Sequence, residues 1–298
     1  MIKNWYDLRD AQNSRGSSSL SVADKDLGER VYTSKLIGKN PDLVMHGGGN
    51  TSVKVERRNL FGELERVLHV KGSGWDLDTI LAPGLPGVRL EPLLKLRRLK
   101  TLSDEDMVNV QRNNLLNSSS PNPSVETLLH AFLPHKFVDH THADAVVTIS
   151  NSPDGKETLK RLFGDEVLIL PYVMPGFILA KQVAAATESI DWSAIKGIVL
   201  LNHGILTFGD DAKTSYDSMI DLVDTAEKFL LSKMDEHTIA KVDASITEQD
   251  CLQLTQLRRR AGDFFEGPVL VRLNSSDTAV GFSALGNFED HITRGPLT

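Results

Sequence analysis

Cysteine is almost absent from this sequence, since Cys251 is the only one among 298 residues. A single cysteine cannot form a disulfide within the chain, so the fold does not need an oxidising compartment. No segment approaches the roughly 20 consecutive apolar residues that a membrane-spanning helix requires. The first residues, Met1–Asp7, lack the apolar core of a secretory signal. These absences predict a cytoplasmic protein with no membrane partner.

Positive charge is also scarce. The sequence has 33 Lys and Arg against 40 Asp and Glu, and its formal net charge is -7. Such a chain has no net positive field to attract phosphate backbones, which argues against nucleic acid as the main partner. The strongest basic run, residues 95–100, is interleaved with leucines and is typical of a solvated helix face. No Gly-x-Gly-x-x-Gly motif follows a predicted strand, so there is no sign of a nicotinamide site.

What the sequence does contain is ordinary for a globular protein, with 40% hydrophobic and 24% charged residues. Periodicity predicts a hairpin from strands at 53–56 and 66–70, and buried strands at 145–149, 167–170 and 197–201. It predicts helices at 23–37, 90–99, 104–116, 124–133, 178–186 and 212–234. Residues 81–88, with two prolines and two glycines, read as a surface loop. Alternating strands and helices predict an α/β fold.

The two ends of the sequence differ from its centre. Residues 1–22 are polar and are expected to form a loose N-terminal arm. Residues 23–242 hold the α/β pattern and are predicted to form one domain. Residues 243–298 are predicted to be an appendage or a linker, with a charged helix at 247–262, a strand at 269–273 and a polar tail.

Two histidines, His140 and His142, stand just before the apolar run 145–149. If the strand conformation extends back to residue 140, the two side chains point to the same face, because side chains alternate along a strand. Two imidazoles about 7 Å apart can then bind one cation. This motif alone is weak, since two histidines that are simply hydrogen-bonded where a strand begins would explain it equally well.

A third histidine strengthens the hypothesis of a metal site. His203 follows the predicted strand 197–201, and Gly204 allows the chain to turn there. Three imidazoles leave a coordination position open, as a catalytic metal requires. Asp139 or Asp144 is predicted either to orient a ligand histidine or to face solvent.

Glu126 is predicted to lie in the first turn of a helix that follows Pro123 and Ser124. A glutamate there either complements the helix dipole or acts as a general base beside the metal. His130 and His135 are predicted to be packing or supporting residues.

Five motifs, in this order and spacing, resemble the class II aldolase/adducin family over about residues 25–235. They are Gly48-Gly49-Asn50-Thr51-Ser52, Gly72-Ser73-Gly74, Ser124-x-Glu126, His140-x-His142 and Asn202-His203-Gly204. Within the family, the sequence is most similar to the aldolase domain of bifunctional rhamnulose-1-phosphate aldolase/alcohol dehydrogenases. That likeness rests on Val70-Lys71-Gly72-Ser73-Gly74, Leu129-His130-Ala131-Phe132-Leu133-Pro134 and Thr293-Arg294-Gly295-Pro296.

The resemblance implies a three-layer α/β/α sandwich around a central, mostly antiparallel sheet. It also implies a homotetramer with active sites at the subunit interfaces. The implied cofactor is Zn²⁺ or another divalent cation on His140, His142 and His203, with Glu126 as the catalytic acid/base.

The substrate implied by the resemblance is a sugar phosphate. Asn50, Ser73, Gly74 and Ser124 fall where these aldolases bind phosphate, and glycine loops and helix starts do form anion sites. Tyr172 falls near a position from which a neighbouring subunit's tyrosine donates a proton. A buried tyrosine with a structural hydrogen bond is the alternative interpretation.

The resulting hypothesis is a metal-dependent aldolase. It would cleave a ketose 1-phosphate, such as rhamnulose or fuculose 1-phosphate, reversibly through a metal-stabilised enediolate. One departure is Val125, which replaces a hydroxyl residue that often binds phosphate in these enzymes. The alternatives are a pentulose-phosphate 4-epimerase or another enolate-forming relative, and a non-enzymatic adducin-like module. The complete set of three histidines and Glu126 argues against the module.

Overall fold

A seven-stranded sheet organises the computed structural model, which describes residues 1–233 and 247–284. The strand order is β3-β2-β1-β4-β7-β6-β5. The strands are β1 (Asn50–Arg58), β2 (Leu64–Val70), β3 (Gly87–Arg89), β4 (Phe137–Thr141), β5 (Val167–Leu170), β6 (Gly197–Leu200) and β7 (Gly204–Gly209). Only β5 and β6 pair in parallel, and the other pairs in this sheet are antiparallel. The mostly antiparallel α/β sheet that the family resemblance implied is confirmed.

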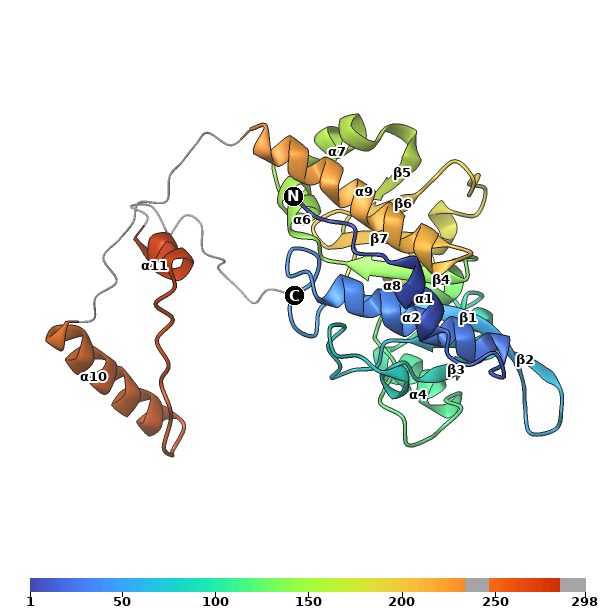
Figure 1. Cartoon of the computed structure of the whole chain (residues 1–298), viewed down its shortest axis with the longest axis horizontal. Coiled ribbons are helices and arrows are strands. Elements are labelled where there is room, and N and C mark those ends of the chain that lie inside the picture. The colour runs from blue at the N-terminus through green and yellow to red at the C-terminus, as the bar shows by residue number, and fades with distance from the viewer. Residues whose placement is uncertain (234–246, 285–298) are drawn as a thin grey trace. The chain divides into compact units, whose positions relative to one another are not determined.

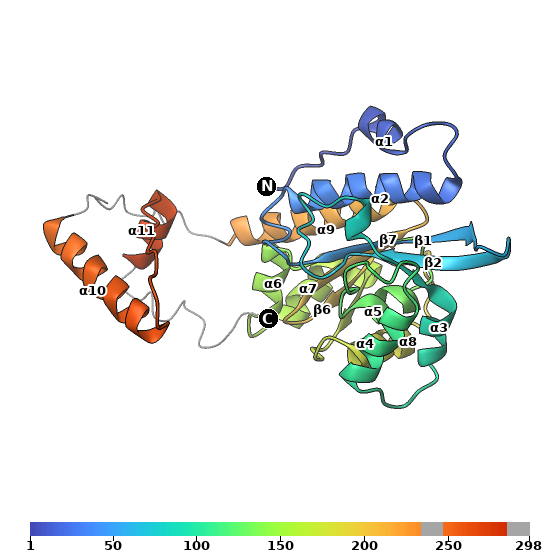
Figure 2. The ribbon, with the colours of Figure 1, turned by 90° about the horizontal axis from the view of Figure 1, so that it is seen from below.

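Helices flank both faces of the sheet (Figures 1 and 2). Those of the first part of the chain are α1 (Leu8–Ser14), α2 (Val22–Gly38), α3 (Leu90–Leu96), α4 (Asp104–Asn113), α5 (Thr127–Phe132), α6 (Asp144–Ser150), α7 (Gly155–Phe163), α8 (Phe177–Ala186) and α9 (Ala212–Leu231), with short 3₁₀ turns at Ala82–Gly84 and Gly164–Glu166. Figure 2 shows α2 and α9 on one face and α3, α5 and α8 on the other. The architecture is therefore a three-layer sandwich.

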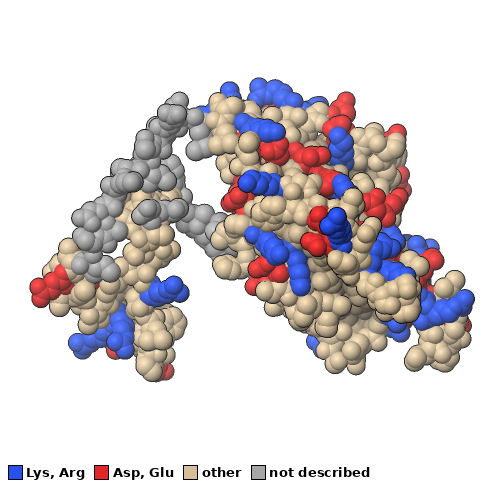
Figure 3. Space-filling view, in the orientation of Figure 1, with Lys and Arg blue, Asp and Glu red and all other residues tan. Residues whose placement is uncertain are grey.

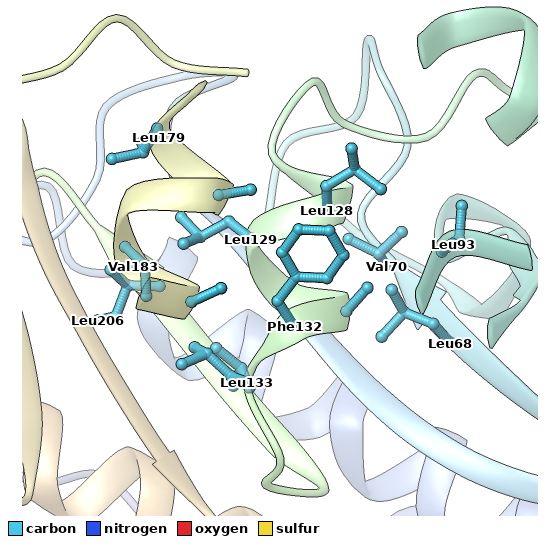
Figure 4. Close-up of a cluster of buried hydrophobic side chains, with 14 of the residues drawn as sticks. Leu68, Val70, Leu93, Leu128, Leu129, Phe132, Leu133, Leu179, Val183 and Leu206 are labelled. Atoms are coloured by element: carbon cyan, nitrogen blue, oxygen red, sulfur yellow. The ribbon is translucent and has the colours of Figure 1, made fainter. Parts of the chain in front are cut away.

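The short helix α5 is fixed by packing on all sides (Figure 4). Leu128, Leu129 and Phe132 are buried in the core cluster that includes Leu68 of β2 and Val183 of α8. Burial of each such side chain contributes about 1.5–3 kcal/mol, so a helix of only six residues is stable here although it would not be in isolation. The segment that leads into α5, which carries Glu126, is held in place as a result.

The apolar run 145–149 is not the strand that the sequence predicted, but lies in helix α6. Ala145, Val146 and Ile149 are its buried residues, at a spacing that matches one face of a helix, and α6 packs on α9. The strand, β4, comes immediately before it, at Phe137–Thr141. Strand β7 was not predicted, although the hairpin β1–β2 and strands β5 and β6 are confirmed.

The expected loose arm at residues 1–22 is ordered against the main body instead. Asp7 caps α1 by accepting hydrogen bonds from the backbone, and Ala11 is buried. The backbone nitrogen of Ile2 donates to Glu227 Oε2 at 2.6 Å, and the Ile2 side chain is buried. The expected surface loop 81–88 also differs, because Leu85 and Val88 are buried and β3 pairs with β2.

The chain divides into two compact units, Met1–Lys233 and Met234–Thr298. In the second unit, α10 (Glu248–Phe264) starts with a capping box of Thr247 and Asp250, which confirms the predicted charged helix. The strand predicted at 269–273 is absent, and α11 (Asp277–Ser283) follows instead. Most of the predicted polar tail, with the motif at 293–296, lies outside the described residues.

The structure shows a surface of mixed charge. Positive and negative side chains are interspersed over the face of Met1–Lys233 that Figure 3 shows. Within residues 1–233 and 247–284, no helix is both long and apolar enough to cross a membrane.

Candidate metal centre and active-site pocket

Three imidazoles meet at one end of the central strands. His140 lies next to the last residue of β4, His142 follows that strand, and His203 lies in the turn between β6 and β7. The Nε2 atom of His140 is 3.1 Å from Nε2 of His142 and 3.3 Å from Nε2 of His203. Because β4 and β7 are hydrogen-bonded neighbours, the turn that precedes β7 lies beside the end of β4. Pairing of these strands brings together histidines that are 63 residues apart.

The local sequence around His203 suits this close approach. Asn202 adopts a left-handed φ of 59°, which asparagine tolerates better than most residues, and its amide donates to Asn151 Oδ1 at 2.8 Å. A Cβ atom on Gly204 would lie 2.3 Å from the backbone oxygen of Thr141 and 3.1 Å from the His140 ring. Only glycine fits between the two strands at this point.

His140 is fully buried and His142 and His203 are partly buried, and burial lowers the pKa of all three imidazoles. Burial, and then the neighbouring His142, lowers the pKa of His140 to about 3. Burial, and then His140, lowers the pKa of His203 to about 4. The backbone oxygen of Ile205 lies 3.0 Å from His140 Nδ1 and accepts its hydrogen, so that His140 Nε2 presents a bare lone pair.

This donor set fits a divalent cation. The ligand atoms of His140, His142 and His203 all lie within 4.8 Å of one another. Zinc bound tetrahedrally by imidazoles at about 2.0–2.1 Å places the ligand nitrogens about 3.3–3.4 Å apart, which is close to the observed 3.1 and 3.3 Å. Three neutral nitrogen ligands also leave the fourth position of such a site open.

Glu126 lies beside the same imidazole nitrogens. It is the residue immediately before α5, not a member of its first turn as predicted, and it is buried. Its Oε2 lies 3.4 Å from His140 Nε2, and its Oε1 lies 3.3 Å from His203 Nε2. Asn50 of β1 donates its amide hydrogen to Glu126 Oε2 at 2.6 Å. A carboxylate and three imidazoles therefore converge on one small volume.

A cavity of about 370 Å³ opens beside this cluster. All four predicted phosphate-binding residues line it together with Glu126 and His142, namely Asn50, Ser73, Gly74 and Ser124. The amide of Asn50 is already engaged, because Nδ2 also lies 3.4 Å from Ser124 Oγ. Tyr172 is not among the lining residues.

Several residues of the pocket escaped the sequence reasoning. Val108, Gln111 and Arg112 of α4 form one wall, and no motif pointed to them. Lys71 also lines the cavity, and its Nζ donates to the backbone oxygens of Gly47 and Gly49, at 2.5 and 3.1 Å. Lys71 precedes Gly72-Ser73-Gly74, so this motif could have indicated that Lys71 lies in the pocket. The α4 residues could be found only from the packing of the helix.

Predicted supporting residues fall elsewhere. Asp139 does not orient a ligand histidine, because it is paired with Arg30 at 2.6 Å. Asp144 begins α6 and is exposed. Tyr172 is 43% exposed, and its hydroxyl donates to the Met174 sulfur at 3.8 Å, so the alternative of a buried structural tyrosine is wrong. His135 stacks on Phe208, as a packing residue would.

Comparison with known proteins identifies the family. Residues 29–230 match the family described as Class II Aldolase and Adducin N-terminal domain. The solved N-terminal class II aldolase domain of a conserved protein from Thermoplasma acidophilum is 44% identical, with a TM-score of 0.65 over 73% of this chain and 98% of that one. The sugar-phosphate aldolase of Thermotoga maritima, 16% identical with a TM-score of 0.54 over 72% of this chain and 99% of that one, shares the fold. The chain therefore belongs to the class II aldolase and adducin family.

A curated relative extends beyond this domain. The uncharacterized oxidoreductase YuxG of Bacillus subtilis (strain 168) is 36% identical over 240 residues, which are 80% of this chain. The match spans only 33% of the relative's length.

Proposed function

We propose that this protein is a metal-dependent aldolase that cleaves a ketose 1-phosphate reversibly, with rhamnulose or fuculose 1-phosphate as candidate substrates. The observation that carries the proposal is the convergence of Glu126 and the three histidines. Both carboxylate oxygens of Glu126 lie within 3.4 Å of imidazole Nε2 atoms. This arrangement supports Glu126 as a proton-transfer group beside a bound cation, at the edge of the cavity.

The roles of the residues follow from their chemistry. His140, His142 and His203 would hold Zn²⁺ or another divalent cation. When bound, such a cation supplies Lewis-acid stabilisation of the electron pair that remains after the carbon–carbon bond breaks. Glu126 takes the proton from the substrate hydroxyl in the cleavage direction and returns it in the condensation direction. Burial of the carboxylate excludes water that would compete for this proton.

Two loops that line the cavity are proposed to bind the phosphate. Ser73, Gly74 and Ser124 come from these loops. The backbone N–H groups of Ser73 and Ser124 already donate to the oxygens of Asn122 and Lys71, so the two serine hydroxyls are the groups offered to an anion. Val125 is 57% exposed and supplies no hydroxyl, so this site offers one donor fewer than a serine or threonine there would give. Substrate binding through the phosphate should accordingly depend on the two serines.

The decisive experiment combines metal analysis with a sugar panel. Protein purified without added metal should carry about one divalent ion per chain and should cleave one of the ketose 1-phosphates. Glu126→Gln should keep the metal and lose turnover by about 10²- to 10⁴-fold. Glu105→Gln on the exposed part of α4 is the matched control and should behave as wild type. Undiminished turnover in Glu126→Gln would remove its role.

Product analysis separates the alternatives. A pentulose-phosphate 4-epimerase would return an isomer of its substrate without an aldehyde product. Absence of bound metal together with no turnover on the whole panel would favour an adducin-like module.

The proposal includes a homotetramer in which Tyr172 of a neighbouring subunit donates a proton. Its support is the exposure of Tyr172 together with Met174 and Ile178, which are 64% and 67% exposed. Light scattering should report four chains per particle, and Tyr172→Phe should lower turnover while the particle mass is unchanged. A monomer with full activity would contradict this part of the proposal.

A further inference from the structure

Behind Glu126, a chain of buried hydrogen bonds runs from α5 to β1 and back. Ser52 Oγ lies 2.8 Å from His130 Nδ1. His130 Nε2 is hydrogen-bonded to Asn50 Oδ1, and Asn50 Nδ2 lies 2.6 Å from Glu126 Oε2. All four residues are buried, and the His130 and Ser52 side chains have no exposed surface. The first three of these residues have no place in the mechanism proposed above.

The chemistry of the groups fixes the direction of every hydrogen in this chain. A carboxylate only accepts, so Asn50 Nδ2 donates to Glu126, and Asn50 Oδ1 must face His130. A carbonyl oxygen only accepts as well, so His130 Nε2 carries a hydrogen. Burial lowers the pKa of His130 well below its usual value, so the ring is neutral and its Nδ1 has no hydrogen. Nδ1 therefore accepts from the Ser52 hydroxyl.

All hydrogens thus point toward Glu126, and each bond polarises the next. The chain ends on Oε2 alone. Both carboxylate oxygens lie near imidazole Nε2 atoms, but Glu126 Oε1 is buried and has no hydrogen-bond partner among the described residues. One carboxylate oxygen is anchored while the other is left to act.

We infer that His130 is a positioning residue for Glu126, which through Asn50 holds Oε2 in place and presents Oε1 to the substrate. The inference rests on the proposed function, because it assigns Oε1 as the atom that moves the proton. It also gives Asn50 a different task from the predicted one, since both of its amide hydrogens have partners within the protein.

A histidine is well suited to this position because it must accept at one end and donate at the other. Glutamine can do the same, with Oε1 accepting from Ser52 and Nε2 donating to Asn50. Phenylalanine fills the space but can do neither. His130→Gln is therefore the conservative variant and His130→Phe the disruptive one. His135→Phe is the matched control, since His135 stacks on Phe208 outside the hydrogen-bond chain.

Kinetics on the ketose 1-phosphate that the panel identifies test the inference. His130→Phe should lower kcat by about 10- to 100-fold with KM changed by less than about threefold, because orientation of the base is lost and substrate contacts are kept. His130→Gln should recover most of kcat, and both variants and His135→Phe should retain full metal content. Wild-type kcat in His130→Phe, or equal losses in both His130 variants, would overturn the inference.

A second measurement does not depend on catalysis. Imidazole ¹⁵N shifts of the zinc-loaded protein at pH 7 should show His130, assigned by its loss in His130→Gln, as the neutral tautomer with hydrogen on Nε2. The opposite tautomer, or an imidazolium, would disprove the hydrogen-bond chain even in an active enzyme. If no sugar is turned over and the Nε2 tautomer is found, the proposed function fails while the hydrogen-bond chain remains.

Discussion

Two buried polar clusters lie back to back on β4, and they are built in opposite ways. Asp139 and His140 are consecutive residues, so their side chains point to opposite faces of the sheet. Asp139 pairs with Arg30 of α2 at 2.6 Å and accepts from Ser215 of α9 at 2.6 Å. His140 belongs to the imidazole cluster, where Glu126 Oε1 and His203 Nδ1 are buried without hydrogen-bond partners among the described residues.

The difference separates a structural role from a binding role. Arg30 is fully buried, and burial alone lowers its pKa, whereas Asp139 counteracts this effect as its counterion. Buried polar groups in stable proteins almost always have partners, so unpaired atoms indicate a ligand site or strain. The cluster of Asp139, Arg30 and Ser215 is closed, because its charges are balanced within the protein. Asp139 Oδ1 makes no well-aligned hydrogen bond, but the Arg30 guanidinium lies 2.6 Å from it as its counterion. The cluster around His140 is open, because Glu126 Oε1 lies beside imidazole nitrogens and has no Lys or Arg counterion among the described residues, an arrangement that suits a bound cation.

The largest effect is expected when the open cluster is disrupted. His140→Ala or His203→Ala should remove the bound metal and lower activity by about 10³-fold or more, because Lewis-acid stabilisation worth several kcal/mol is lost. Elemental analysis and turnover measure both quantities, and circular dichroism checks the fold. His135→Ala is the control. A variant that kept full metal content would show that the ligand assignment is wrong.

Disruption of the closed cluster should cost stability instead. Asp139→Asn leaves Arg30 buried without a counterion and should lower the free energy of unfolding by about 3–5 kcal/mol. Urea unfolding measures this change. Arg30→Met combined with Asp139→Leu should recover a large part of it, because neither charge is then buried. An equal loss in the double variant would argue against the ion pair as the cause.

A fall in pH should destabilise the protein through the open cluster, and this effect is the next largest. The folded pKa values of His140 and His203, about 3 and 4, lie below the ordinary value of 6.5. Between these values the unfolded chain binds more protons than the folded one. The metal-free protein should therefore lose stability as the pH falls from 6.5 toward 4, by up to about 1.4 kcal/mol per pH unit for each histidine.

Urea unfolding of the metal-free protein at several pH values tests this dependence. His203→Gln cannot take up the proton and should show a shallower slope than the wild type. Equal slopes would mean that other groups cause the acid sensitivity.

The smallest effect is expected at the edge of the closed cluster. Ser215→Ala removes one hydrogen bond to Asp139 but leaves the ion pair with Arg30. The free energy of unfolding should fall by about 1–3 kcal/mol, with metal content and turnover unchanged. Calorimetry of the metal-loaded protein would detect the shift. Loss of metal in this variant would mean that the two clusters are not independent.

Prediction from sequence succeeded where the signal was local. The hairpin of β1 and β2, helix α2 and strand β5 follow from periodicity and turn residues. It failed where the local signal was ambiguous. Residues 145–149 combine β-branched residues with helical spacing, and packing on α9 decided in favour of α6.

The candidate site was predictable in part for the same reason. The motifs contain His140, His142, His203 and Glu126, because each loop or strand end carries its own pattern. The wall that α4 forms with Gln111 and Arg112 was not predictable. Nothing in the sequence of α4 distinguishes a helix that faces a pocket from any other helix.

By itself, the sequence determined which chemical groups are available: three histidines, one glutamate and glycine loops at positions where chain turns are easy. The tertiary structure decided that these groups meet. Antiparallel pairing of β7 with β4 places His203 beside His140, and packing of α5 between sheet and helices brings Glu126 to the same point. The physical reason is that hydrogen bonds between strands and burial of apolar faces join segments far apart in the chain, and no local pattern specifies such partners.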